Sequence, residues 1–68
     1  MEENKIIILI DHTIHHNEHH MEDFETIAKD LRIAGADDAA ELAQSAIKDI
    51  ENANKKLAQA RDLYKENF

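Results

Sequence analysis

The sequence contains no cysteine and no proline, and only one glycine among its 68 residues. Without cysteine, disulfide bonds and thiolate metal sites are excluded. A single glycine cannot build the glycine-rich loop that cradles a phosphate group. A chain of this length forms one domain, residues 1–68, and buries only about 60% of the surface that its unfolded form exposes. We therefore expect a metal ion, a second copy of the chain, or both to supplement a small core.

Basic residues are also scarce, with eight Lys and Arg against fifteen Asp and Glu, for a formal net charge of −7. Nucleic-acid binding depends on basic side chains that neutralise phosphates, so we do not expect it. An acidic surface disfavours anionic membranes and attracts cations. The apolar run from Ile6 to Ile10 is shorter than the roughly 20 residues that span a bilayer, and no signal-peptide cleavage site follows it. We expect a cytoplasmic protein without membrane association.

The apolar lead segment, residues 5–10, is dominated by isoleucine. β-Branched side chains are typical of a buried strand, but periodicity leaves open that the segment extends the helix that follows. Asp11 or Thr13 offers an N-cap oxygen for that helix. We predict a strand-like lead and a helix beginning near residue 12.

Two amphipathic helices are predicted, over about 12–33 and 37–66. In the first, apolar residues recur at helical spacing; they are Ile14, Met21, Phe24, Ala28 and Leu31. The second is rich in alanine, and its apolar positions alternate between three and four residues apart, as in a coiled coil. Gly35 suits the left-handed residue after the first helix, and Asp37 and Asp38 suit the N-terminus of the second.

A short connection makes the two helices antiparallel neighbours, so the fold class is all-α, a helical hairpin. In this register Asn17 meets Asn54 in the apolar seam, a pairing that costs stability but fixes alignment. The hairpin covers one side of each apolar stripe only. We therefore predict a homodimer, a four-helix bundle with two-fold symmetry, in which the lead segments pair as strands or lie over the end of the bundle.

Five histidines lie within nine positions, from His12 to His20, and the rest of the chain has none. At about 100° per residue, His12, His16, His19 and Asp23 share one sector of the helix, with His20 at its edge. Three pairs have i, i+4 spacing; they are His12/His16, His16/His20 and His15/His19. Imidazoles one turn apart can converge on one ion, and they suit zinc, nickel, copper and cobalt.

The ligand set that we predict is His12, His16 and His20, with His19 and Asp23 as auxiliary ligands. His20 should border the core, His16 should be intermediate, and the other histidines should face solvent. Because i and i+8 lie about 12 Å apart along a helix, a closed site must recruit further groups. These are carboxylates such as Glu18, Glu22 or Asp23, or a group from the second helix or a second chain.

Two other interpretations of the histidines remain open. They can form a polar surface, with His20 a boundary residue hydrogen-bonded to Glu51. They can also act as a pH switch, because imidazoles with an ordinary pKa of about 6.5 charge together on mild acidification.

The motif His-x3-His-Asn-x2-His-x3-Phe is formed by His12, His16, Asn17, His20 and Phe24. With its apolar lead and Ala/Glu-rich hairpin, the chain resembles a family of small, functionally uncharacterised prokaryotic proteins. That family has a proline and a tryptophan near the first histidine, where this chain has Asp11 and Thr13. The resemblance implies metal association through His12, His16 and His20, and it names no reaction.

No catalytic arrangement is evident. Ser45, the only serine, lies far from the histidines in the predicted hairpin. Di-iron bundles use Glu-x2-His on paired helices, whereas His15-x2-Glu18 and His19-x2-Glu22 have the reverse order. We therefore expect a metal-binding accessory protein, a sensor, store or chaperone, that is not an enzyme, with zinc or nickel as the first candidates. The alternative is a structural module without a physiological metal, whose second helix docks on a partner helix.

Overall fold

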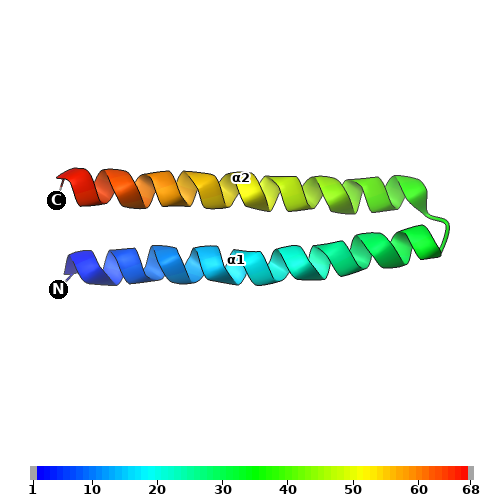
Figure 1. Cartoon of the computed structure of the whole chain (residues 1–68), viewed down its shortest axis with the longest axis horizontal. Helices are drawn as coiled ribbons and strands as arrows, with labels where there is room; N and C mark the ends of the chain where they lie inside the picture. The colour runs from blue at the N-terminus through cyan, green and yellow to red at the C-terminus, as the bar shows by residue number, and fades with distance from the viewer. Residues whose placement is uncertain (1, 68) are drawn as a thin grey trace.

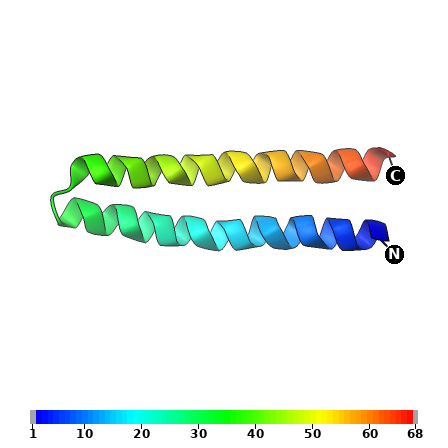
Figure 2. The ribbon, with the colours of Figure 1, turned by 180° about the vertical axis from the view of Figure 1, so that it is seen from behind.

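The computed structural model describes residues 2–67, with side chains described from residue 5 onward. Two helices make up the chain, α1 (Glu2–Ile33) and α2 (Asp37–Asn67). They lie antiparallel and side by side along their whole length, with both termini at one end and the loop at the other (Figures 1 and 2). The Cα atoms span 51 × 15 × 9 Å. The predicted all-α hairpin is confirmed.

The predicted strand over residues 5–10 is wrong, and the open alternative is correct: α1 continues through this segment to Glu2, and the described residues contain no strand. A lone strand in this hairpin would leave its backbone N–H and C=O groups without partners. A helix satisfies them internally, and each added residue costs little once the helix has nucleated. The two residues predicted as N-caps therefore lie inside α1 and make other contacts. Thr13 Oγ1 donates to the Leu9 carbonyl at 2.8 Å, and Asp11 accepts a hydrogen bond from Arg61.

The turn between the helices is a Schellman motif, as the position of the only glycine predicts. Gly35 has φ +83°, the Gly35 N–H donates to the Arg32 carbonyl at 3.0 Å, and the Ala36 N–H donates to the Leu31 carbonyl at 2.9 Å. The Ala36 carbonyl then accepts from the Ala40 N–H at 2.9 Å and so starts α2. Asp37 and Asp38 occupy the first turn of α2, where carboxylates oppose the positive end of the helix dipole.

The predicted asparagine pair is present in the seam. Asn17 Nδ2 donates to Asn54 Oδ1 at 2.9 Å, and Asn54 Nδ2 donates to the Ile14 carbonyl at 3.3 Å. Both side chains are half-buried. These bonds hold α1 and α2 in one axial register.

Few residues are buried in the apolar seam between α1 and α2. Among the described residues only Ala28 and Ala40 are buried, at 5% and 0% exposure. Large apolar side chains are half-buried or exposed, and seven of them are exposed: Ile6, Ile8, Leu9, Ile27, Ile33, Leu42 and Leu63. A single hairpin thus leaves much of its apolar surface in water.

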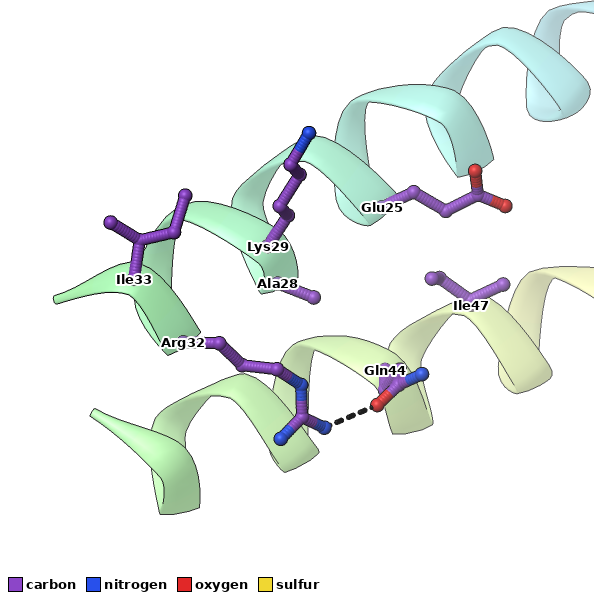
Figure 3. A pocket seen from close by; sticks show the side chains of 7 residues that line it. All are labelled: Glu25, Ala28, Lys29, Arg32, Ile33, Gln44 and Ile47. Atoms are coloured by element: carbon purple, nitrogen blue, oxygen red, sulfur yellow. Dashed lines mark hydrogen bonds between the residues drawn. The ribbon is translucent and has the colours of Figure 1, made fainter. Parts of the chain in front are cut away.

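Two polar contacts bridge the helices along one edge of the seam. Arg61 Nη1 donates to Asp11 Oδ1 at 2.7 Å, and Arg32 Nη2 donates to Gln44 Oε1 at 2.6 Å. The hydrogen bond to Asp11, and then that to Asp62, raises the pKa of Arg61 above its ordinary value. Near the loop this edge has a shallow cleft (Figure 3). Its lining residues are Glu25, Ala28, Lys29, Arg32, Ile33, Gln44 and Ile47.

Across residues 2–67, neither helix contains an apolar stretch long enough to cross a bilayer.

Candidate metal site

All five histidines project from the middle of α1, and all five are exposed. For His12, His15 and His19 this agrees with the prediction. His16 and His20 were expected to be more buried, and that expectation is wrong. The seam side of this turn is taken by Asn17, Met21 and Phe24, which are half-buried, so the His20 ring lies along the helix surface instead.

The His16/His20 pair joins two rings across one turn. His16 Nε2 and His20 Nε2 are 2.9 Å apart, and the rings meet edge to face with their centroids 4.4 Å apart. The His20 ring also lies 6.5 Å from the Phe24 ring, centroid to centroid. His20 contacts His16, and it makes no hydrogen bond to Glu51 within the described structure. One ring donates its N–H to the other, so this pair is a satisfied hydrogen bond.

The His15/His19 pair is built differently. His15 Nε2 and His19 Nε2 face each other at 3.3 Å, while His15 Nδ1 lies 3.5 Å from Glu18 Oε1 and His19 Nδ1 lies 3.4 Å from Glu22 Oε2. A carboxylate beside one ring nitrogen is the usual device that orients a metal-binding histidine and leaves the other nitrogen free to coordinate. In both rings of this pair a carboxylate lies beside Nδ1, at ion-pair distance and between exposed side chains.

The carboxylates also favour one position for the proton of each ring. A neutral imidazole carries one N–H, and beside Glu18 and Glu22 we assign it to Nδ1 in both rings. With that assignment both Nε2 atoms carry lone pairs, 3.3 Å apart, and both can bind a metal ion. If one ring carries its proton on Nε2 instead, the same contact is a hydrogen bond.

The nitrogen separations fit metal coordination. Two nitrogens at 2.0–2.1 Å from a tetrahedral zinc ion lie about 3.3–3.4 Å apart, and a 90° ligand angle brings them to about 2.9 Å. The His15/His19 separation is 3.3 Å and the His16/His20 separation is 2.9 Å. Each pair therefore has the nitrogen separation of two ligands on one ion, which both rings reach once they turn their Nε2 lone pairs toward it.

A third ligand is not brought to either pair by the single chain. The side chains of His12 and Asp23 are exposed and make no hydrogen bond, ion pair or ring contact with other described residues. In the part of the chain that the structure describes, no three His, Asp or Glu side chains converge on one point. Of the predicted set, the structure joins His16 to His20 and leaves His12 apart.

From the sequence, the His15/His19 pair ranks below the His12/His16/His20 set, and Glu18 and Glu22 are possible further ligands rather than partners of His15 and His19. The signal was present, because His15-x2-Glu18 and His19-x2-Glu22 repeat one His–Glu spacing four residues apart. It was judged only against the di-iron pattern, in which the order is reversed. On a helix, i and i+3 side chains meet in either order.

Comparison with known proteins gives a family. A family model described as Domain of unknown function (DUF8180) matches residues 6–64, which include the five histidines and most of both helices. No curated protein and no solved structure matches the chain. Whether the family shares the histidine motif stays a prediction. Because the match covers most of the sequence, the chain belongs to the DUF8180 family.

Proposed function

We propose that the chain is a cytoplasmic, homodimeric accessory protein that holds a divalent transition-metal ion, zinc or nickel first, through the histidines of α1. The observation that carries the proposal is the facing Nε2 atoms of the two pairs, 3.3 Å apart in His15/His19 and 2.9 Å apart in His16/His20. These are separations at which one ion accepts both nitrogens.

The two pairs are the anchors, and His12 and Asp23 are auxiliary candidates that the single chain brings to neither pair. All these groups are exposed, so a bound ion exchanges with solvent or with another protein. Exchange suits a sensor, store or chaperone rather than a structural site, which is closed. The net charge of −7 raises the local concentration of cations around the chain.

A second candidate function is an interaction module in which the metal has no role. It is favoured by the apolar surface that the hairpin leaves uncovered, above all Leu42, which is 75% exposed on α2. Exposed apolar patches mark binding surfaces for other proteins. Under this alternative the histidines are only a polar surface.

The two candidates differ in a competition titration with zinc or nickel and a chromophoric chelator at neutral pH. The first expects micromolar or tighter binding, weakened at least tenfold by the double substitutions His16→Ala/His20→Ala or His15→Ala/His19→Ala. Glu18→Gln/Glu22→Gln should weaken the His15/His19 site about tenfold, since orienting carboxylates contribute about 10–100-fold to affinity. Millimolar binding that none of these changes affects would leave the interaction module.

A further inference from the structure

We propose that two copies of the chain hold one metal ion between them, with His16 and His20 of each copy supplying its four ligands. This inference rests on the proposed metal binding, and it specifies which groups complete the coordination of the ion. One hairpin provides only two convergent nitrogens at this point, whereas zinc is commonly four-coordinate. The face of the hairpin around His16/His20 supplies the reason to expect a second copy there.

His16 and His20 lie in an apolar stripe along α1. Leu9 precedes His16 by seven residues and Ile27 follows His20 by seven, spacings that place all four on one side of a helix. Leu9 is 65% exposed and Ile27 is 49% exposed. We call Leu9, His16, His20 and Ile27 the α1 stripe.

The hairpin has two broad faces, and the α1 stripe lies on the one opposite the Arg61–Asp11 and Arg32–Gln44 contacts. The Arg61–Asp11 and Arg32–Gln44 contacts join the helices along one edge of the seam. At about 100° per residue, the α1 stripe lies on the other side of α1 from Asp11 and Arg32. The same count on α2 places a second row away from Gln44 and Arg61; this row is Leu42, Ala46, Ala53 and Ala60. One broad face of the hairpin thus carries both rows, and the Arg61–Asp11 and Arg32–Gln44 contacts lie on the opposite face.

The α1 stripe is symmetric about its centre. Leu9 and Ile27 are each nine positions from Glu18, and His16 and His20 are each two positions from it. The midpoint of α1 falls beside Glu18, between residues 17 and 18. A two-fold axis that passes beside α1 at this level, perpendicular to the helix, places the stripe of one copy against the same stripe of the other, as an isologous interface requires.

In the resulting dimer, α1 packs antiparallel on α1 of the partner, and the two loops lie at opposite ends. His16 then faces the partner's His20, and Leu9 faces the partner's Ile27. Facing helices in bundles pack about 8–10 Å apart, a spacing at which side chains from both helices hold metals in bundle cores. The row on α2 has alanine at three of its four positions, so α2 and its copy can also approach closely.

The size of the face is sufficient for a dimer. The broad face spans 51 by 15 Å between Cα atoms, comparable with the roughly 800 Å² per partner of a standard protein interface. Two copies that each carry −7 repel one another, and a divalent cation at the axis offsets part of that repulsion. Metal binding and dimerisation are therefore linked.

The first test measures two quantities on the intact chain. One is the number of zinc ions bound per chain, and the other is the mass of the protein in solution, measured by light scattering with and without zinc. We expect one zinc per two chains at the tightest site, with zinc increasing the dimer fraction at least tenfold at low chain concentration. His16→Ala/His20→Ala should remove both effects. The control Asn52→Ala lies at an exposed position on α2, outside both histidine pairs, and should leave both effects unchanged.

The second test is a cross-link that reports the register. Leu9→Cys and Ile27→Cys chains, mixed and oxidised, should form a disulfide between unlike chains, because facing Cα atoms can come within the roughly 7 Å that a disulfide spans. Leu9→Cys alone should not cross-link, since its two copies lie about 27 Å apart along the helices. The native chain has no cysteine to interfere.

The outcomes separate this inference from the proposed function. Zinc bound tightly at one per chain, without dimerisation, overturns the shared site and leaves the metal-binding function standing. Efficient cross-linking of Leu9→Cys to itself also overturns it, because that result requires parallel α1 helices or a two-fold axis at the level of residue 9 instead of Glu18. Absence of micromolar binding in every form overturns both.

Discussion

Asn17 and Asn54 show how one polar pair positions two helices. Their hydrogen bond, 2.9 Å from Nδ2 to Oδ1, spans a seam that is otherwise apolar. Sliding one helix by a turn would leave both amides half-buried without this partner, which costs about 1–3 kcal/mol per unsatisfied group. The pair thus selects one register among several that the apolar spacing alone would allow.

Replacing Asn17 with alanine should destabilise the hairpin by about 1–2 kcal/mol, because Asn54 Oδ1 loses its donor. Asn17→Ala/Asn54→Ala should cost less than the sum of the two single changes, since the residues interact directly. Urea unfolding followed by circular dichroism measures both values. Asn52→Ala, at an exposed position, is the control and should change stability by no more than about 0.5 kcal/mol. An equal effect of Asn17→Ala and Asn52→Ala would contradict the role of the pair.

At the scale of elements, the two ends of α1 were predicted with different success. Its C-terminus follows from local chemistry, because Gly35 takes the left-handed conformation, with φ +83°, and the two Schellman hydrogen bonds close the last turn. Its N-terminus lies ten residues before the predicted start, at Glu2. Isoleucine favours strands only where a neighbouring strand accepts its hydrogen bonds, and the hairpin offers none.

Gly35→Ala should destabilise the hairpin by about 1 kcal/mol. A Cβ at this position would meet nothing within 4 Å, so the cost is the backbone strain of a left-handed alanine alone. Gly35→Asn should cost less, because asparagine tolerates this conformation. Thermal unfolding of the three proteins at one concentration gives the order. Equal stability of Gly35→Ala and the native chain would mean that the turn does not require a positive φ.

At the scale of the whole molecule, the single hairpin has a very small hydrophobic core. Ala28 and Ala40 are its only buried residues among those described, and two alanine side chains remove little apolar area from water. Small domains without disulfides depend on association or on a metal. The proposed dimer and the proposed metal site would each add stability that this small core does not provide.

The midpoint of thermal unfolding should therefore rise by several degrees over a hundredfold increase in chain concentration, as mass action requires of a folded dimer. Leu9→Glu should abolish this dependence, because it places a charge in the proposed interface. Ile8→Glu is the matched control: Ile8 and Leu9 are neighbours with exposures of 66% and 65%, but Ile8 lies outside the α1 stripe. A midpoint independent of concentration, or equal effects of the two substitutions, would contradict a dimer through this face.

The sequence by itself determined the features that arise from local chemistry and periodicity. Apolar spacing indicated two helices, the lone glycine indicated the turn, and a short loop aligned Asn17 with Asn54. The i, i+4 spacing likewise indicated the His15/His19 and His16/His20 contacts, but it also indicated His12/His16, which the structure does not join. These features involve interactions within a few residues or the geometry of one regular helix.

Only the tertiary structure decided the features that depend on how side chains and helices are placed. Residues 5–10 became helix because no strand lies beside them among the described residues. The apolar rows of α1 and α2 share one broad face because the helices run antiparallel with their polar contacts on the other. Such features depend on the positions of atoms on two elements at once, which no local sequence pattern specifies.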